Sequence, residues 1–543
     1  MQAGFAMLEA GIVQPKNITN ILFKNVTDAC IAAICFWLLG YGFAYGKDQG
    51  GFIGGSNFAL SDSFSNSGGA KSDGYEDWFF KWAFAAVVAT IVTGAVAERT
   101  KVEAYFTYTI VLTAFIYPVV VHWGWGSGWL SAWGAFPTAQ GVARPIFRYD
   151  QRSNGMIDFA GSGIVHMVGG FSALVGAIIV GPRVGRFDPD TRRPYELTAG
   201  NKALQALGTL ILWFGWYGFN CGSTLILAGG EDGINAGGGK LAGKVAMTTT
   251  LSAASGGLSC VFITLVVEGE YDITMLLKGV LGGLVGISAN CAVVDPWHAA
   301  FIGAISGFVF YVGHHLLFLL RIDDPCDSSV VHGFCGVWGM LATGIFCTDK
   351  NIQYAAYPNI NDACGRGEQF GVQLIGVLVI ICWTVATAGF TFFLITVTVG
   401  LRVDIDTEEE GIDLSTHGGP ADDYQTNLKT NARSIDAKIV VPPPAPMFQG
   451  PTFNPMMNSR DALGSVGLMP SMGMNGMAMD GNMGMNGMGA MNLGRNGVGG
   501  MDGGLYSSNG MGGIDGSMGM NGMGGIDMMT GRQSPAFAGG RMM

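Results

Sequence analysis

Two histidines stand in repeated surroundings, and imidazole is the side chain best suited to passing on a proton near neutral pH. His166 and His332 each occupy the pattern D-x3-S-x-[IV]-V-H-x3-G, which begins at Asp158 and at Asp324. Each histidine lies within about twenty mainly apolar residues, the length of a membrane span. An ionisable group inside such a span is costly and marks a functional site by default.

A single buried histidine is more often a structural residue whose ring bonds a backbone carbonyl. Two copies in matching contexts favour function, because internally repeated membrane proteins place their sites where the repeats meet. In each copy a glycine, Gly170 or Gly336, follows the histidine by four residues and so lies near its face of a helix. We expect these glycines to let a neighbouring helix approach closely.

Composition indicates an all-α polytopic membrane protein. The chain has 543 residues, of which 49% are hydrophobic and 13% charged, and its mean hydropathy is positive. Successive apolar runs of about twenty residues cross a bilayer as α-helices. With 29 Lys and Arg against 40 Asp and Glu, the chain is not expected to bind nucleic acid. Neither a metal-ligand cluster nor a nucleophile–base pair accompanies the histidines, so we expect no enzyme activity, metal or cofactor.

Eleven apolar runs are expected to cross the membrane. The first, 1–13, is shorter than the ~20 residues that a span needs, so we expect the sequence to begin inside its first transmembrane helix. Several runs are rich in Gly and Ala, which favours close helix packing in lipid. The other ten runs cover 27–45, 79–97, 104–125, 158–180, 203–222, 245–267, 276–294, 298–319, 329–347 and 370–400.

Basic residues predict the orientation of the chain in the membrane. The arginine-rich loop 183–193 falls on the same side as Lys16, Arg99 and Arg402, whereas the opposite loops are longer and mixed in charge. The positive-inside rule therefore places this side and the C-terminus in the cytoplasm, and the N-terminus outside.

The sequence divides into three parts. Residues 1–401 form the membrane domain, and the acidic, polar stretch 402–425 suits a cytoplasmic regulatory segment. Residues 426–543 begin Pro-rich and continue as a Met/Gly/Asn repeat that holds 21 of the 28 methionines. This last part has too few aromatic and β-branched residues to form a core, so we expect it to be disordered. Met-rich tracts can bind Cu(I), but a low-complexity spacer is the simpler interpretation.

Further motifs are spread along the chain: Met1-Gln-Ala-Gly-Phe-Ala-Met-Leu-Glu-Ala-Gly11, Gly94-Ala-Val-Ala-Glu-Arg99, Gly181-Pro-Arg-Val-Gly-Arg-Phe187, Trp213-Phe-Gly-Trp-Tyr-Gly-Phe-Asn220 and Asp323-Asp-Pro325. Together with the two histidine motifs, they make residues 1–420 resemble the ammonium transporters of the Amt/Mep/Rh family, most nearly its eukaryotic, plant-type branch. The resemblance implies two inverted five-helix repeats plus one extra helix, a homotrimer with one pore per subunit, and a plasma-membrane location.

The resemblance also implies roles for individual residues. His166 and His332 match the paired pore histidines, and Phe84 and Phe219 match the stacked phenyl rings of the outer gate. The external recruitment site and the residues around it are matched by Trp125, Ser223, Phe80, Trp216 and Asp158. From the residues alone, the aromatic side chains would be interpreted as packing or lipid-facing, so only the positional match supports a role for them.

The implied substrate, ammonium or methylammonium, suits such a site. Its cation is attracted to aromatic faces by about 0.5–2 kcal/mol each, and its N–H donors distinguish it from potassium. Because a bare cation in an apolar pore is expensive, we expect deprotonation near the gate, passage of ammonia, and a proton relay through His166 and His332. The alternatives are an electroneutral Rh-type ammonia channel and an ammonium sensor that signals through its C-terminal tail.

Four further residues or pairs carry expectations. Asp158 could cap its helix, shape the electrostatics of the site, or both. Lys81 stands where the family usually has a neutral polar residue, and would place a positive charge beside the entrance for a cation. Ser415 lies in a segment resembling the family's regulatory C-terminus, which docks on neighbouring subunits, and matches its phosphorylation position. Cys347 and Cys364 flank one polar loop and could pair.

Overall fold

Helices make up most of the part of the chain that the structure describes, as the apolar composition predicts. This computed structural model describes residues 1–61, 75–132, 147–149, 152–191, 193–195, 197, 200–225, 238–355, 357, 364 and 367–419. The predicted disordered tail 426–543, and the last residues of the predicted segment 402–425, lie outside the described residues.

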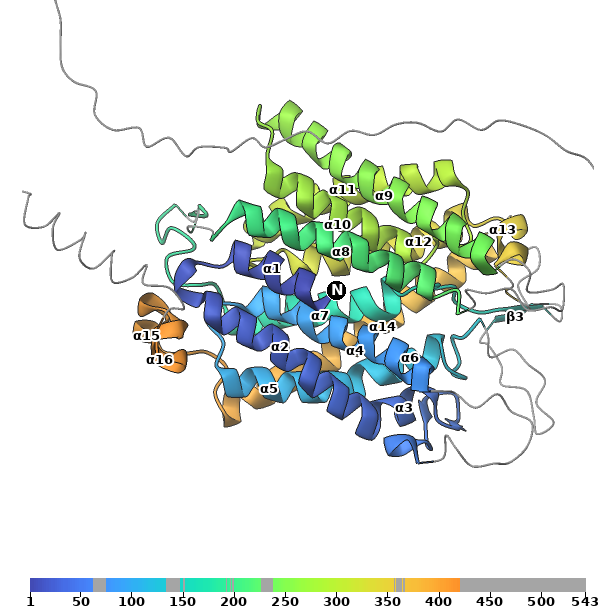
Figure 1. The fold of residues 1–543 in the computed structure, drawn as a ribbon, viewed down its shortest axis with the longest axis horizontal. Coiled ribbons are helices and arrows are strands. Elements are labelled where there is room, and N and C mark those ends of the chain that lie inside the picture. Colours follow the sequence, from blue (N-terminus) through green and yellow to red (C-terminus); the bar gives the residue numbers. More distant parts are fainter. Residues whose placement is uncertain are drawn as a thin grey trace, which may run out of the picture. The chain divides into compact units, whose positions relative to one another are not determined.

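Eleven helical segments follow one another in the described residues and match the eleven predicted runs (Figure 1). Eight are long and apolar enough to cross a membrane, and α10 is a shorter apolar helix. The chain is therefore an all-α polytopic membrane protein. The segments are α1 (Gln2–Ile12), α2 (Ile18–Cys35) with η2 (Phe36–Gly40) and α3 (Tyr41–Tyr45), α4 (Tyr75–Val96), α5 (Val102–Val111) with η4 (Leu112–Ile116) and α6 (Tyr117–Gly124), η5 (Ser162–Met167) with α7 (Val168–Val180), α8 (Lys202–Gly222), α9 (Gly238–Val267), α10 (Ile273–Ser288), α11 (Pro296–Leu320), η6 (Ser329–Phe334) with α12 (Cys335–Phe346), and α14 (Glu368–Thr398).

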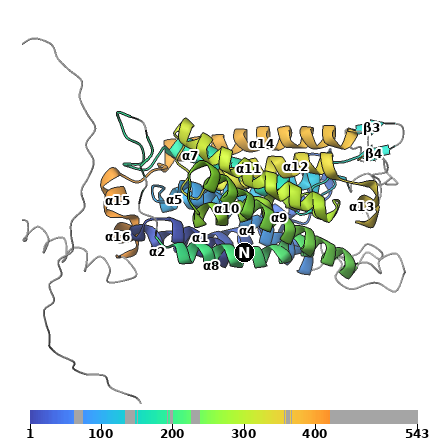
Figure 2. The ribbon, with the colours of Figure 1, turned by 90° about the horizontal axis from the view of Figure 1, so that it is seen from above.

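Short elements lie at the two ends of these helices. Figure 2 shows α13, β3 and β4 at one end, and α15 and α16 at the other. Each of the two small sheets is a single antiparallel pair, β1 with β2 and β3 with β4. The elements are η1 (Pro15–Asn17), β1 (Asp48–Gln49), β2 (Ile53–Gly54), η3 (Phe58–Leu60), β3 (Phe147–Tyr149), β4 (Arg152–Asn154), α13 (Asp349–Tyr354), α15 (Ile405–Glu410) and α16 (Ile412–His417).

Polar side chains fix where several helices begin. Asn201 caps α8 by accepting hydrogen bonds from the backbone N–H groups of Ala203 and Leu204. Asp272 starts α10 and Thr348 starts α13 in the same way. The first N–H groups of a helix have no partner inside it, so a side-chain oxygen placed just before an apolar run satisfies them. These helix starts are therefore encoded locally in the sequence.

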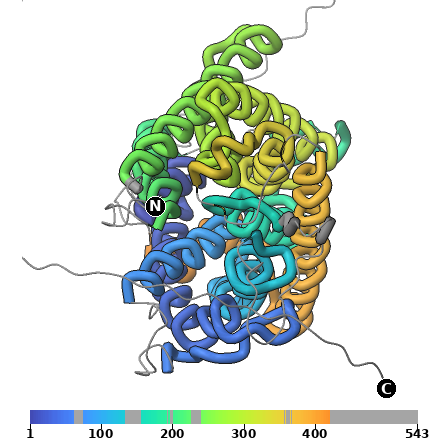
Figure 3. The backbone as a smooth tube through the Cα atoms, turned by 90° about the vertical axis from the view of Figure 1, so that its right-hand side faces the viewer, coloured from blue at the N-terminus to red at the C-terminus, as the bar shows by residue number. Residues whose placement is uncertain are grey.

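The two histidine motifs lead into corresponding helices, the fifth and the tenth of the eleven. Each of these helices begins with a π-helical segment, η5 or η6, that contains the histidine. Such segments occur frequently at functional sites. In Figure 3 the blue helices α2 to α6 gather in the lower part of the view and the green to yellow helices in the upper part, with α14 (orange) along one flank. The first helix, α1, lies beside the green α8, where Gly4 packs against Leu212.

Glycines allow the two histidine helices to cross closely. A Cβ atom on Gly170 would lie 2.1 Å from the backbone nitrogen of Gly333. In the reciprocal direction, a Cβ atom on Gly336 would lie 2.7 Å from the carbonyl oxygen of Ser162. Neither space accommodates a side chain. The close approach expected at Gly170 and Gly336 is therefore confirmed. At each glycine, the neighbouring backbone belongs to the other histidine motif.

Basic residues gather at one end of the bundle, which we call the arginine end. Arg183 pairs with Asp323 at 2.8 Å and also with Glu98. Arg99 donates to the carbonyl of Asp323 at 2.6 Å. Burial opposes the ionisation of Asp323, but the charges of Arg183 and Arg99 outweigh it and hold the pKa of this carboxyl well below its ordinary value. Basic residues that the sequence predicted to share one side of the membrane therefore meet.

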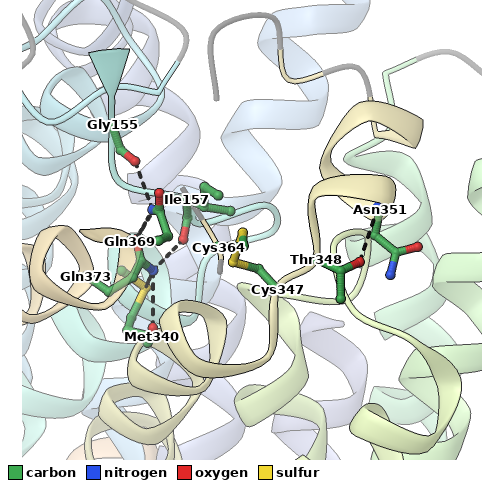
Figure 4. The surroundings of a disulfide bond; sticks show 9 residues. All are labelled: Gly155, Ile157, Met340, Cys347, Thr348, Asn351, Cys364, Gln369 and Gln373. Carbon is green, nitrogen blue, oxygen red and sulfur yellow. Dashed lines mark hydrogen bonds between the residues drawn. A yellow bond between two sulfur atoms is a disulfide. The ribbon is translucent and has the colours of Figure 1, made fainter. Parts of the chain in front are cut away.

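The opposite end, which we call the disulfide end, carries a cross-link. Cys347 and Cys364 are joined, so the pairing left open by the sequence is present (Figure 4). The helix Ser329–Phe346, roughly 27 Å long at 1.5 Å per residue, separates Cys347 from the arginine end. Gln369 and Gln373 of α14 donate to nearby backbone carbonyls and hold α14 against this end (Figure 4).

The helix crossing generates a stability prediction. We expect Gly170→Ala to destabilise the protein by about 1–3 kcal/mol, because the added methyl group overpacks the contact with Gly333. Gly371→Ala in α14 is the matched control, since nothing lies within 4 Å of its Cβ position. Thermal unfolding of the two purified variants measures the difference. Equal unfolding temperatures for both would contradict the close crossing.

Candidate functional site

An aromatic pocket of about 190 Å³ opens at the disulfide end. It lies beside the start of α4 and the ends of α6 and α8. Because α4 ends at Val96, two residues before Glu98 of the arginine end, the pocket is distant from that end. Four of its lining residues carry predicted roles: Phe80, Phe84, Trp125 and Ser223. The other lining residues are Tyr45, Lys81, Phe159 and Leu225.

Aromatic rings form much of the pocket wall. Phe80 and Phe84 stand one helical turn apart on α4, and their ring centroids are 4.8 Å apart. Trp125 packs edge-on against Phe84 at 5.4 Å, and its indole N–H donates to the carbonyl of Asp158 at 2.6 Å. Aromatic faces attract cations through the ring quadrupole. The pocket is therefore chemically suited to a small cation.

Ser223 supplies a polar group to the same wall. It follows the last residue of α8, and its hydroxyl donates to the carbonyl of Phe219 at 2.8 Å. Because this bond uses the only hydroxyl hydrogen, the oxygen is left as an acceptor. An acceptor on the wall suits a cation that carries N–H donors.

Two phenyl rings lie between the pocket and the histidines. Phe84 and Phe219 have centroids 4.1 Å apart, and only 2% and 4% of their surfaces are exposed. They come from α4 and α8, one helix from each half of the bundle. The resemblance predicts stacked rings, whereas their planes are tilted by 38°; tilted and offset pairs avoid the repulsion of a face-to-face sandwich. Phe219 also contacts His166, with centroids 5.5 Å apart.

The two histidines meet ring to ring in the interior. The Nδ1 atoms of His166 and His332 are 3.2 Å apart, and the ring planes differ by 23°. One nitrogen donates and the other accepts, according to the tautomers. Trp216 stacks on His166 at 5.2 Å and 18°, and its indole N–H is bonded to Ser288 at 3.0 Å. The fold therefore brings together the two histidines that the sequence repeat singles out.

His166 has a further property that a purely structural histidine would lack. Its Nε2 atom is buried and has no hydrogen-bond partner among the described residues. Leaving a buried polar atom unpaired costs about 1–3 kcal/mol, so such atoms call for an explanation. The interpretation of His166 as a ring satisfied by a backbone carbonyl does not fit these contacts.

Asp158 is a helix cap. Its carboxylate accepts hydrogen bonds from three backbone N–H groups at the start of η5, those of Gly161, Gly163 and Ile164. Asp324 does the same in the second motif by accepting from Ser329 at 2.7 Å. The capping role is therefore confirmed for Asp158, whose carbonyl also orients Trp125, and its electrostatic role stays a prediction.

Sequence reasoning missed several residues of the pocket. Tyr45, Phe159 and Leu225 line it but carry no local signal, because they come from separate segments that only the fold brings together. The ion pair between Asp77 and Lys81 could have been found, since a carboxylate and an ammonium four residues apart on a helix face each other. Lys81, which the resemblance places beside the entrance, lines the pocket, and its contact with the Tyr45 ring follows only from the structure.

The segment after α14 folds back against the arginine end of its own chain. Asp413 accepts hydrogen bonds from the backbone N–H groups of Thr19 and Asn20 at 2.8 and 2.7 Å. Lys16 donates to the carbonyl of Glu408 at 2.7 Å. These contacts tie α15 and α16 to the start of α2, and they place Lys16 at the arginine end, as the loop charges predict.

Ser415 lies on the exposed side of this segment. Its hydroxyl donates to the carbonyl of Ile412 at 3.2 Å, within α16, and lies 3.4 Å from the hydroxyl of Thr416; the residue is exposed. Ser415 is therefore exposed in this chain, and its role as a phosphorylation site stays a prediction. Asp413, two residues earlier, holds the segment to α2.

Known proteins share both the sequence and the fold. The profile of the Ammonium Transporter Family matches residues 1–422. The chain is 42% identical over 427 residues to "Putative ammonium transporter 1 member 5" of Arabidopsis thaliana, covering 77% of this chain and 82% of that protein. It is 40% identical over 444 residues to "Ammonium transporter 1 member 3" of Solanum lycopersicum, covering 80% and 92%. The solved structure "Sensor Amt Protein" superposes with a TM-score of 0.65 at 32% identity, covering 76% of this chain and 94% of that one. By sequence and by fold, the chain belongs to the Ammonium Transporter Family.

Proposed function

We propose that this membrane protein transports ammonium by separating it into ammonia and a proton. Ammonium is recruited at the aromatic pocket, loses its proton near Phe84 and Phe219, and crosses as ammonia while the proton passes through His166 and His332. The observation that carries the proposal is the 3.2 Å contact between the two imidazole Nδ1 atoms, next to the phenyl pair. Membership of the family supports the choice of substrate.

Recruitment follows from the chemistry of the pocket wall. The faces of Trp125, Phe80 and Phe84 attract the cation by about 0.5–2 kcal/mol each. The oxygen of Ser223 accepts one of its N–H groups, which potassium cannot offer. A site whose acceptor bonds the N–H groups of ammonium therefore discriminates against potassium, a cation of similar size.

The phenyl pair marks the point at which the charge becomes expensive. Phe84 and Phe219 are in van der Waals contact, so a passing molecule requires the rings to rotate aside. Behind them the surroundings are aromatic and apolar, and an unpaired cation there costs several kcal/mol. Ammonia carries no charge and avoids most of that cost, so leaving the proton near the rings is the less expensive route.

The histidine pair offers the proton a separate path. When His166 donates from Nδ1 to His332, its unpartnered Nε2 is an acceptor. A proton that binds Nε2 makes His166 an imidazolium, which then releases its Nδ1 proton to Nδ1 of His332. His332 in turn releases a proton from its own Nε2. The charge has crossed both rings, and return of the two tautomers prepares the pair for the next proton.

Two other functions remain as alternatives. An electroneutral Rh-type channel would pass ammonia without net charge. An ammonium sensor is favoured by the similarity to the structure named "Sensor Amt Protein". In a sensor, flux is incidental, so a variant whose pore is blocked would keep its signalling intact.

We propose that the protein lies in the plasma membrane with the disulfide end outside. Disulfides persist in oxidising compartments, and short basic loops stay in the cytoplasm. These two arguments are independent and give the same orientation. The aromatic pocket then faces external ammonium, and the segment that carries Ser415 faces cytoplasmic enzymes.

The relay generates the first functional prediction. His332→Ala should abolish the current evoked by ammonium, because the proton loses its acceptor, while uncharged ammonia still crosses. His315→Ala is the control, since this histidine is half exposed and pairs with Glu268. Voltage clamp measures the current, and stopped-flow measurements on vesicles report ammonia permeability. An unchanged ammonium current in the double variant His166→Ala/His332→Ala would contradict the proposed relay.

The orientation generates a labelling prediction. After a membrane-impermeant reductant is added to intact cells, an impermeant maleimide should label Cys347 and Cys364. A variant with both cysteines changed to serine provides the background, because other thiols are present in the chain. Labelling that appears only after the cells are permeabilised would reverse the proposed orientation.

We further propose that the protein is a homotrimer whose C-terminal segments couple the three pores.

Phosphate on Ser415 adds about −1.5 to −2 charges beside acidic residues and should detach the C-terminal segment by repulsion. Ser415→Asp should therefore stop transport and Ser415→Ala preserve it, with Thr191→Asp in an exposed loop as the charge control. Native mass spectrometry of each variant, expected to show three chains, separates lost coupling from lost assembly. Equal transport by both Ser415 variants would refute this regulation.

A further inference from the structure

The aromatic pocket already holds a cation that belongs to the protein. Among the described residues that line the pocket, Lys81 alone is charged. Its Nζ atom lies 3.6 Å from the centroid of the Tyr45 ring, a direct cation–π contact. The same atom is 2.5 Å from a carboxylate oxygen of Asp77. The lysine therefore points along the pocket rim and not out into the solvent.

The groups around this ammonium form a small site. Asp77 also accepts a hydrogen bond from the hydroxyl of Tyr41 at 2.9 Å, which fixes the position of its carboxylate. The rings of Tyr41 and Tyr45 are 5.3 Å apart, and the Lys81 nitrogen lies 5.9 Å from the centroid of Tyr41. The side chains of Lys81 and Asp77 are 18% and 20% exposed, so solutes reach the site.

This site would bind the substrate for the same reasons that it binds the lysine. Ammonium and the head of a lysine are both compact cations that offer only N–H donors. A carboxylate that accepts those donors and an aromatic face that attracts the charge serve either cation equally. Because the lysine head is tethered beside the site, it competes with free ammonium and raises the ammonium concentration needed to occupy the site.

We propose that Lys81 is a tethered competitor of ammonium. Its side chain occupies an outer cation subsite formed by Asp77, Tyr41 and Tyr45, and this raises the ammonium concentration needed for half-maximal transport. The inference rests on the proposed function, and it assigns to this chain a residue that sets apparent affinity. A pair that only stabilised the start of α4 would instead affect folding and leave the half-saturation concentration unchanged.

The test measures labelled methylammonium uptake against concentration in cells that lack their own carrier. Lys81→Gln should lower the half-saturation concentration about three- to tenfold, because one competing and repelling charge is removed. Lys81→Arg keeps a cation in place and should retain the wild-type value. Lys350→Gln is the matched control, since Lys350 is an exposed lysine at the same end of the bundle and outside the pocket lining.

A second variant tests the subsite itself. Asp77→Asn in the Lys81→Gln background should reverse the gain, because the carboxylate that the lysine had occupied is no longer available to ammonium. An unchanged or higher half-saturation concentration in Lys81→Gln would overturn the proposal, and a gain that survives Asp77→Asn would overturn the subsite. Absence of saturable uptake in the wild type would instead contradict the proposed function, so the two failures are distinguishable.

Discussion

An unpaired charge is expensive in an apolar interior, and this constraint organises the membrane domain. The interior contains two imidazoles, which can be neutral, and each half of the bundle supplies one of them. Their contact requires the two histidine helices to approach to backbone distance, which the glycines at Gly170 and Gly333 permit. It also requires the rings to point at one another, and each ring projects from a π-helical segment whose start is held by an aspartate cap. In the proposed mechanism, separate paths for ammonia and its proton follow from this arrangement.

The two ends of the bundle solve the same constraint in opposite ways. At the arginine end, buried charges are paired: Arg183 lies between Glu98 and Asp323, and the C-terminal segment adds further polar contacts to α2. Breaking one partner of such a network leaves an uncompensated buried charge, which suits a region that holds segments of the chain together. At the disulfide end, the aromatic pocket offers faces and acceptors instead, which suits reversible binding of a cation.

Much of this arrangement could be predicted because its signals are local or repeated. The eleven apolar runs, the capping aspartate Asp158 and the close approach at Gly170 each follow from patterns within a few turns of helix. The meeting of the two histidines was expected from the repeat, and the contact distance came from the fold. Tyr45 and its contact with Lys81 could not be predicted, because a ring on α3 and a lysine on α4 become neighbours only through tertiary packing. The tilt of the phenyl pair likewise depends on packing between α4 and α8.

The central claim is that charge and nitrogen cross this protein together but by separate routes. Its most direct test is the simultaneous recording of current and labelled methylammonium uptake in cells that lack their own carrier. The account predicts an inward current that saturates at the same methylammonium concentrations as uptake does. This current should carry one positive charge for each methylammonium accumulated. Saturable uptake without any accompanying current would contradict it.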